Sequence, residues 1–218
     1  MTRVIPISVV TDTICPWCYI GKKRLETAMT NFKQRPGNSD VEFEISYEPY
    51  QLSPDSSKEG VNKIEAYEKK MGKDRVEKMI PYMKQVGQSV GIQFSYGGLI
   101  GNTFDSHRLV RYAGLQSQSV QNDIVNKLYR AYFEEEKNIA DVDLLVEIGV
   151  SSGLDATQLR DLFASESLVK ETQNALGKVK SKGITGVPHF TIGETVEVSG
   201  GQEPQVFEAY FDSILPQK

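Results

Sequence analysis

The two ends of the chain carry strand patterns, and helical patterns fill the middle. Residues 4–10 are rich in Val and Ile and alternate loosely, and residues 41–47 alternate strictly with a period of two. Both patterns are typical of β-strands. The segment between them, from 16 to about 31, has apolar residues at helical spacing. A strand, a helix and a strand within fifty residues predict a βαβ unit, with a parallel pair and a right-handed crossover.

Helical patterns dominate from about residue 58 to about 180. The predicted helices span 64–70, 76–90, 105–116, 120–135, 142–151 and 156–163. Strand character then returns at 188–192 and 195–198, and the intervening Gly193-Glu194 turn predicts a hairpin. A last amphipathic helix carries apolar residues from Val206 to Leu215.

This order is explained most economically by a thioredoxin-like α/β fold with a helical insertion. In such a fold the βαβ unit at the start of the chain and the hairpin and helix at its end combine into one sheet with its covering helices. We therefore expect residues 1–53 and 164–218 to form the thioredoxin-like domain, and residues 54–163 to form the helical insertion domain.

Composition excludes several classes of partner. The 218 residues carry a formal net charge of −4, whereas nucleic acids and anionic membranes attract clustered Lys and Arg. The basic run Lys22-Lys23-Arg24 is expected to be the solvated face of a helix. No stretch approaches the roughly 18 apolar residues of a membrane span. The N-terminus runs straight into a strand without a signal-peptide pattern, so we expect a cytoplasmic protein.

Cys15 and Cys18 are the only two cysteines, and they stand one helical turn apart after the first strand. A zinc site needs about four ligands. His107 and His189 complete that number without the local spacing of known sites, so we expect no metal. Inert buried thiols are a second interpretation. Redox chemistry is favoured, because a thiol at a helix N-terminus becomes a nucleophile near neutral pH.

In this interpretation Cys15 attacks a disulfide and forms a mixed disulfide, which Cys18, deeper in the helix, resolves. The two residues between them adjust the site: Pro16 stiffens the turn, and Trp17 offers a large apolar face to a substrate.

Gly186-Val187-Pro188 is the second notable group. A proline that opens a strand cannot donate to the ladder, so it belongs at an edge or in a special turn. X-Pro bonds are trans by default. The position of Pro188, where the chain re-enters the sheet after the helical insertion, shifts that expectation towards cis.

Together these motifs make the chain resemble the DsbA-like thioredoxin family, and within it the branch of FrnE-type dithiol–disulfide isomerases. The residues that carry the resemblance are Asp12, the run Ile14-Cys15-Pro16-Trp17-Cys18-Tyr19, Gly21-Lys22, Asn102-Thr103 with His107-Arg108, Ala131-Tyr132-Phe133, Asn138-Ile139-Ala140-Asp141, Val187-Pro188 and Val198-Ser199-Gly200-Gly201-Gln202.

The resemblance implies that Pro188 is cis and packs beside the Cys15 sulfur. It also implies that the backbone of Val187 faces the substrate and pairs with an extended peptide. The same superfamily includes 2-hydroxychromene-2-carboxylate isomerases and kappa-class glutathione transferases. Those typically carry a serine where Cys15 stands, and they use glutathione. We expect no cofactor to be required, and the resemblance implies that glutathione can dock in the same cleft as a reductant or co-substrate.

The two histidines each have two interpretations. His107 lies on a helix of the insertion, with Asn102 or Thr103 as the N-cap. It is either a hydrogen-bonded, partly buried histidine, or it lines the cleft with Asn102 and helps to place a substrate or a proton near Cys15. His189 follows Pro188 directly, and either modulates the Cys15 thiolate or faces solvent.

The sequence therefore predicts a thiol–disulfide oxidoreductase or isomerase that acts on a disulfide-containing protein or a small thiol. A rival hypothesis is a glutathione-dependent transferase or isomerase for a small aromatic or polyketide-like compound. A third is a non-catalytic, redox-responsive binding or chaperone protein. The redox direction and the oligomeric state have no signature in the sequence, because CxxC pairs span a wide range of potentials.

Overall fold

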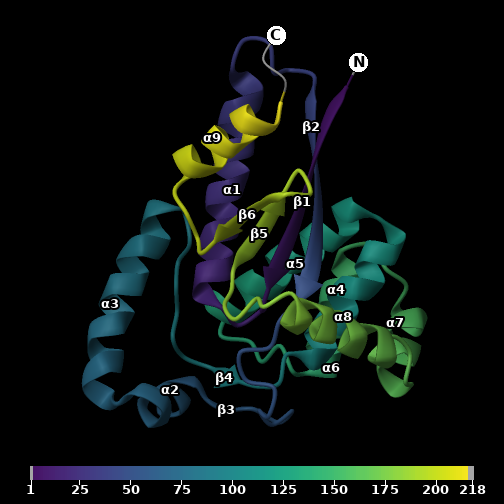
Figure 1. Ribbon diagram of the computed structural model, residues 1–218. Coiled ribbons are helices and arrows are strands. Elements are labelled where there is room, and N and C mark those ends of the chain that lie inside the picture. Colours follow the sequence, from purple (N-terminus) through teal and green to yellow (C-terminus); the bar gives the residue numbers. More distant parts are fainter. Residues whose placement is uncertain (1, 216–218) are drawn as a thin grey trace.

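A computed structural model describes residues 2–215, and a four-stranded sheet forms its centre (Figure 1). The strand order is β2-β1-β5-β6. β1 pairs in parallel with β2 and antiparallel with β5, and β5 pairs antiparallel with β6. The strands are β1 (Arg3–Thr11), β2 (Val41–Pro49), β5 (His189–Ile192) and β6 (Val196–Ser199). Strands from both ends of the sequence thus meet at β1 and β5.

Helix α1 (Pro16–Gln34) connects the parallel pair, and it packs against the last helix, α9 (Pro204–Ile214). Both helices begin with a proline, which has no N–H to leave unpaired in the first turn. Phe211 of α9 lies edge-on to Phe32 of α1, with ring centroids 5.4 Å apart, and contacts Phe43 of β2 at 4.7 Å. These aromatic contacts join the C-terminal helix to the first βαβ unit.

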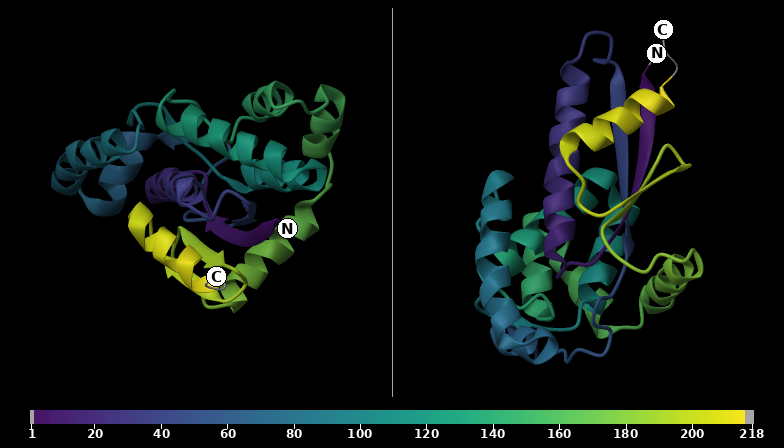
Figure 2. Two further views of the ribbon diagram at one scale, coloured as in Figure 1. Left: turned by 90° about the horizontal axis from the view of Figure 1, so that it is seen from above. Right: turned by 60° about the vertical axis from the view of Figure 1, so that its left-hand side comes forward.

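Seven further helices and a short two-stranded ladder lie between β2 and β5 within residues 2–215. They are β3 (Val61–Asn62), α2 (Lys63–Met71), α3 (Lys73–Ser89), β4 (Leu99–Ile100), α4 (Phe104–Gln116), α5 (Gln118–Phe133), α6 (Val142–Ser151), α7 (Ala156–Ala164) and α8 (Val169–Ser181). Helices α4, α5 and α8 contact β2. Seen from above, helix α1 lies between the teal helices of the middle segment and the yellow helix α9 (Figure 2).

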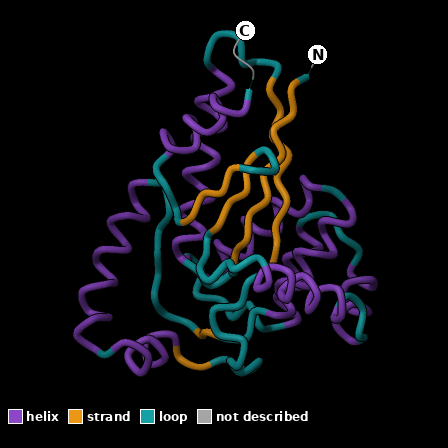
Figure 3. The backbone as a smooth tube through the Cα atoms, in the orientation of Figure 1, coloured by secondary structure: helices purple, strands orange, loops and turns teal. Residues whose placement is uncertain are grey.

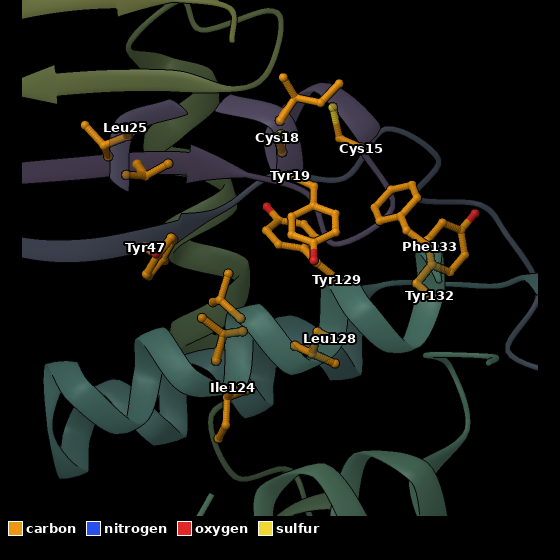
Figure 4. Close-up of a cluster of buried hydrophobic side chains, with 14 of the residues drawn as sticks. Cys15, Cys18, Tyr19, Leu25, Tyr47, Ile124, Leu128, Tyr129, Tyr132 and Phe133 are labelled. Carbon is orange, nitrogen blue, oxygen red and sulfur yellow. The ribbon is translucent and has the colours of Figure 1, made fainter. Parts of the chain in front are cut away.

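Helix α5 also reaches the first turn of α1 through aromatic side chains. The ring of Tyr19 in α1 stacks on Tyr129 at 5.0 Å and lies 6.0 Å from Phe133. Figure 4 shows these rings next to Cys15 and Cys18. Helix α5 therefore packs against the turn of α1 that carries the two cysteines.

The buried Arg108 of α4 holds the connection between α7 and α8. Its guanidinium donates to the carbonyl oxygens of Leu162, Ser165 and Ser167 at 2.5, 2.8 and 2.7 Å, and to Asp105 at 2.9 Å. The guanidinium thus supplies donors to carbonyl oxygens at and after the end of α7, which have no partner within the helix. One arginine therefore bonds the segment that leads from α7 into α8.

The predicted element order agrees with these elements, with three differences. α8 was not delimited by the pattern, the last helix ends at Ile214, and the β3–β4 ladder, separate from the main sheet in Figure 3, was missed. The solvated face expected at Lys22 is wrong, because Lys22 is buried and bonded to Glu26. The division of the chain at 53/54 and 163/164 stays a prediction.

Candidate active site

Cys15 occupies the N-cap position of α1, and both cysteines are free thiols. The Cys15 N–H donates to the Asp12 carbonyl at 3.0 Å, and the Cys18 N–H donates to the Cys15 carbonyl at 3.1 Å. The exposed fraction is 5% for Cys15 and 2% for Cys18. The loop geometry therefore presents Cys15 at the end of the helix and keeps Cys18 below it.

The surroundings of Cys18 favour its protonated form. Burial raises the pKa of Cys18 well above its usual value, and the neighbouring Cys15 raises it further, while Thr11 and Asp12 act in the opposite direction. The Thr11 hydroxyl is itself hydrogen-bonded to the Tyr129 hydroxyl. Only a thiolate attacks a disulfide, so Cys18 is a poor nucleophile as long as this environment keeps it protonated.

Val187 and Pro188 face Cys15 from the start of β5. The Val187–Pro188 peptide bond is cis, and the Cys15 Sγ lies 3.6 Å from the Val187 carbonyl oxygen, to which the thiol donates. Pro188 is buried, Val187 is half-buried, and the Pro188 carbonyl accepts the Gly200 N–H at 2.8 Å. The thiol and this backbone segment thus form the two sides of one site.

Two glycines allow this close approach. A methyl group on Gly21 of α1 would lie 3.1 Å from a ring carbon of Pro188, and one on Gly201 would lie 3.0 Å from the Trp17 carbonyl oxygen. Both distances are shorter than ordinary van der Waals contacts. Arg24 of α1 also links the helix to this segment, since its guanidinium donates to the Gly201 carbonyl at 2.6 Å. The Gly200-Gly201 motif therefore seats the first turn of α1 against the hairpin.

Pro16 and Trp17 are half-buried in the first turn of α1. Trp17 packs against the core, and its predicted contact with a substrate stays a prediction. Pro16 lines a cavity of about 250 Å³ between this turn and the α2–α3 region. The cavity is lined by Ile14, Pro16, Leu52, Ser53, Ser56, Val61, Ala66, Tyr67, Lys70, Met71, Met79, Tyr96 and Ile100. We call it the tyrosine pocket; sequence reasoning missed it.

His107 is buried, and its ring is engaged with the protein. Its Nε2 lies 2.8 Å from the Tyr50 carbonyl oxygen and 3.3 Å from Oδ1 of Asp12, whose other carboxylate oxygen, Oδ2, accepts the Leu52 N–H at 2.7 Å. A carbonyl only accepts, so Nε2 carries the proton. His107 and Asp12 therefore tie the segment after β2 to the loop before Cys15. Direct contact of His107 with a substrate stays a prediction.

Asn102 organises the same segment. Its side-chain oxygen accepts from the Phe104 N–H at 2.8 Å and from Gln51 at 3.1 Å, and its amide donates to the carbonyls of Pro54 and Ser56 at 2.7 and 3.1 Å. The cap bond of α4 thus comes from Asn102, although Thr103 occupies the N-cap position and makes no side-chain bond there. Its predicted contact with a substrate stays a prediction as well.

His189 lies on the polar face of the β5–β6 hairpin. Its Nδ1 is 3.1 Å from the Ser199 hydroxyl, and its Nε2 is bonded to the Glu197 carboxylate. With Val187 and Pro188 it lines a second cavity of about 720 Å³. His189 thus borders the site on the side of the hairpin, and its influence on Cys15 stays a prediction.

Two further observations concern residues 2–215 as a whole. No group of three or more His, Cys, Asp or Glu side chains is placed to hold a metal ion among them. None of the helices in that range combines the length and hydropathy needed to cross a membrane.

Comparison with known proteins places this geometry in context. A sequence profile of the DSBA-like thioredoxin domain matches residues 6–212. The crystal structure of a probable DsbA oxidoreductase from Streptomyces coelicolor superposes with a TM-score of 0.85 at 26% identity, over 98% of this chain and 93% of that one. These two matches confirm the predicted thioredoxin-like α/β fold with a helical insertion.

Two more distant structures share the fold. A 2-hydroxychromene-2-carboxylate isomerase superposes with a TM-score of 0.69 at 14% identity, over 96% of this chain and 95% of that one. The cytosolic disulfide reductase DsbM from Pseudomonas aeruginosa, solved with GSH, gives 0.60 at 15% identity, over 95% and 98%.

Proposed function

Because the chain belongs to the DsbA-like thioredoxin domain family, we propose that it is a thiol–disulfide oxidoreductase or isomerase with Cys15 as nucleophile and Cys18 as resolving thiol. The observation that carries the proposal is the placement of the two sulfurs. Cys15 stands at the N-cap of α1 and faces the Val187 carbonyl at 3.6 Å, while Cys18 is buried one turn below.

The reaction needs only the two thiols and a substrate disulfide. The Cys15 thiolate attacks one sulfur, the substrate S–S bond breaks, and the other substrate half leaves as a thiolate. Cys18 then loses its proton and attacks the Cys15 sulfur, which releases the second half. The enzyme pair is oxidised to a disulfide by two electrons, and the substrate is reduced to two thiols. The reverse sequence transfers the disulfide to a dithiol.

Val187 and Pro188 are proposed to hold the substrate against Cys15. An extended peptide that pairs with the Val187 backbone brings its own disulfide next to the Cys15 sulfur, as in other complexes formed by strand addition. A disulfide-containing protein is therefore one proposed partner, and a small disulfide such as oxidised glutathione is the other. Pro16 and Trp17 lie on the same turn and border the approach.

Exchange with a model disulfide tests the mechanism. Cys15→Ser is expected to abolish turnover, and Cys18→Ser is expected to accumulate a mixed disulfide that mass spectrometry detects at Cys15. Turnover at the wild-type rate in the Cys15 variant would contradict the proposal. The reduction potential of the pair then assigns the direction. A value near the glutathione potential indicates a reductase or isomerase, and a much higher one indicates an oxidant.

A second function is favoured by the tyrosine pocket next to Pro16. It is a glutathione-dependent transferase or isomerase that acts on a small aromatic or polyketide-like compound, with glutathione in the cleft at Cys15. The 2-hydroxychromene-2-carboxylate isomerase and the DsbM structure with GSH share the fold and support this alternative. Saturable glutathione binding together with unchanged turnover in Cys18→Ser would favour it, because such chemistry needs no resolving thiol.

We also infer a cytoplasmic location. Both cysteines belong to the proposed redox pair, and none remains for structural disulfides of the kind found in secreted proteins. The fold neighbour DsbM is described as cytosolic. Fractionation of cells that express the full-length chain tests this inference.

A further inference from the structure

One hydrogen-bond donor of the tyrosine pocket lacks a partner among residues 2–215. Tyr96 lines the pocket and is only 8% exposed, and its hydroxyl has no hydrogen-bond partner within residues 2–215. The hydroxyl of the fully buried Tyr132 interacts with that of Tyr67. A buried polar group without a partner is costly, so it points to a ligand or water that supplies the missing bond.

Tyr67 lines the pocket together with Ile14 and Pro16, the residues on either side of Cys15 in the chain. Its ring centroid is 6.4 Å from that of Tyr96. Burial raises the pKa of Tyr132, and Tyr67 adds to the increase. Burial also raises the pKa of Tyr67, and the hydrogen bond with Tyr132 lowers it. All three hydroxyls therefore keep their protons at neutral pH and act as donors.

The rest of the pocket is mainly apolar. Ile14, Met79 and Ile100 form part of the wall, and the exposed side chains of Leu52 and Val61 extend it towards solvent. An apolar cavity of about 150 Å³ holds one benzene ring. The tyrosine pocket, at about 250 Å³, thus has room for a substituted ring or an aliphatic body of similar size.

We propose that the tyrosine pocket binds a small apolar molecule through a carbonyl-type oxygen, which accepts from Tyr67 and Tyr96, and holds that molecule beside Cys15. The body of the molecule is recognised by the apolar wall, and its oxygen supplies the missing partner of the Tyr96 hydroxyl and accepts a second bond from Tyr67. This rests on the proposed function in one respect, since the bound molecule reacts with Cys15 only if it carries a thiol or disulfide. The inference thus names a substrate class for the same site: small apolar thiols or disulfides with a carbonyl group.

Binding is tested with two unreactive probes of the same shape. Acetophenone carries a carbonyl oxygen, and α-methylstyrene has a CH₂ group in its place. NMR titration of the reduced wild-type chain is expected to give about tenfold tighter binding of acetophenone, a factor that corresponds to about 1.4 kcal/mol. In Tyr67→Phe/Tyr96→Phe the two probes are expected to bind equally. Tyr82→Phe, which alters an exposed tyrosine of α3, is the matched control and keeps the preference.

The stability of the variants shows whether a lost probe preference reflects binding or a failure to fold. Removal of an unpaired buried hydroxyl leaves no new unsatisfied group, so Tyr96→Phe is expected to fold as well as the wild type. If the double variant does not fold, the Tyr96→Phe single variant carries the test and is expected to lose most of the preference.

Alkylation of Cys15 by iodoacetamide tests the placement. Saturating acetophenone is expected to slow the reaction several-fold in the wild type, and to have no such effect in the double variant at the same concentration. Equal binding of both probes to the wild type, a preference that survives the double substitution, or binding without protection of Cys15 would each overturn the inference. Loss of disulfide exchange with the probe preference intact would contradict only the proposed function.

Discussion

Lys63 is a buried lysine at the start of α2, and Lys63→Met tests what its burial costs. Its exposed fraction is 1%, its Nζ donates to the Tyr132 carbonyl at 2.9 Å, and the same nitrogen lies 3.9 Å from the centre of the Tyr132 ring. Burial lowers the pKa of Lys63 from 10.5 to about 8, and the charge of Glu136 opposes this decrease. The folded chain thus disfavours the charged amine.

The sign of the effect follows from the two pKa values. Below pH 8 the amine is charged in both states, and the folded state carries the full penalty. Between pH 8 and 10.5 the unfolded chain holds more protons than the folded one, so stability rises with pH. A difference of 2.5 pKa units corresponds to roughly 3 kcal/mol over this window. Lys63→Met removes the titration and with it the pH dependence.

Urea unfolding at pH 7, 8, 9 and 10 measures the effect. The unfolding free energy of the wild type minus that of Lys63→Met is expected to increase by about 2 to 3 kcal/mol across the series. Lys73→Met, which removes an exposed lysine of α3, is the matched control and is expected to give a flat difference. A flat difference for Lys63→Met would refute the reasoning, because a lysine that titrates equally in both states carries no such penalty.

Three more perturbations test other parts of the structure. Because the pKa of Cys18 is raised, resolution of a mixed disulfide at the neighbouring thiol is expected to accelerate up to about tenfold per pH unit between pH 7 and 9, measured by single-turnover quench; a pH-independent rate would contradict this. Gly201→Ala presses a methyl group on the backbone of α1 and is expected to cost about 1 to 3 kcal/mol in urea unfolding. Gly177→Ala in α8, with open space around it, is its control and is expected to stabilise by up to about 1 kcal/mol. Arg108→Met leaves three carbonyls without their donor and Asp105 with Lys58 as its remaining cationic partner, so a loss of about 3 kcal/mol is expected, whereas a loss below about 1 kcal/mol would show that water replaces the donor.

Periodicity was sufficient to predict the elements that carry the cysteines and the proline. β1 and β2 have alternating or continuous apolar patterns over nine residues each, and the hairpin is marked by its turn. The β3–β4 ladder has two residues per strand, which is too short for any period to show. The segment that leads into α8 is bonded by Arg108, a residue that lies far from it in the sequence. Local patterns carry no information on such contacts.

Charged and aromatic residues were harder to place. Lys22 was predicted to be solvated, and nothing in the sequence singled out Lys63, since residue type alone does not show that Glu26 and a backbone carbonyl accept from them. The tyrosine pocket collects Tyr67 from α2 and Tyr96 from the loop before β4, and it meets Pro16 only through tertiary packing. By contrast, the Cys-Pro-Trp-Cys motif is contiguous, and its helical placement followed directly from the preceding strand.

The contact between Cys15 and Val187 joins residues 172 positions apart, and this separation sets the time that passes between the translation of one residue and that of the other. A ribosome adds about 5 to 20 residues per second, so roughly 10 to 30 s pass between the translation of the nucleophile and that of the carbonyl that faces it. During that interval the growing chain carries both thiols without Pro188, β6 or α9 to enclose them. The two halves of the site are thus translated well apart in time, and both cysteines of the nascent chain stay open to oxidation or to a wrong partner until Val187 and Pro188 have been added.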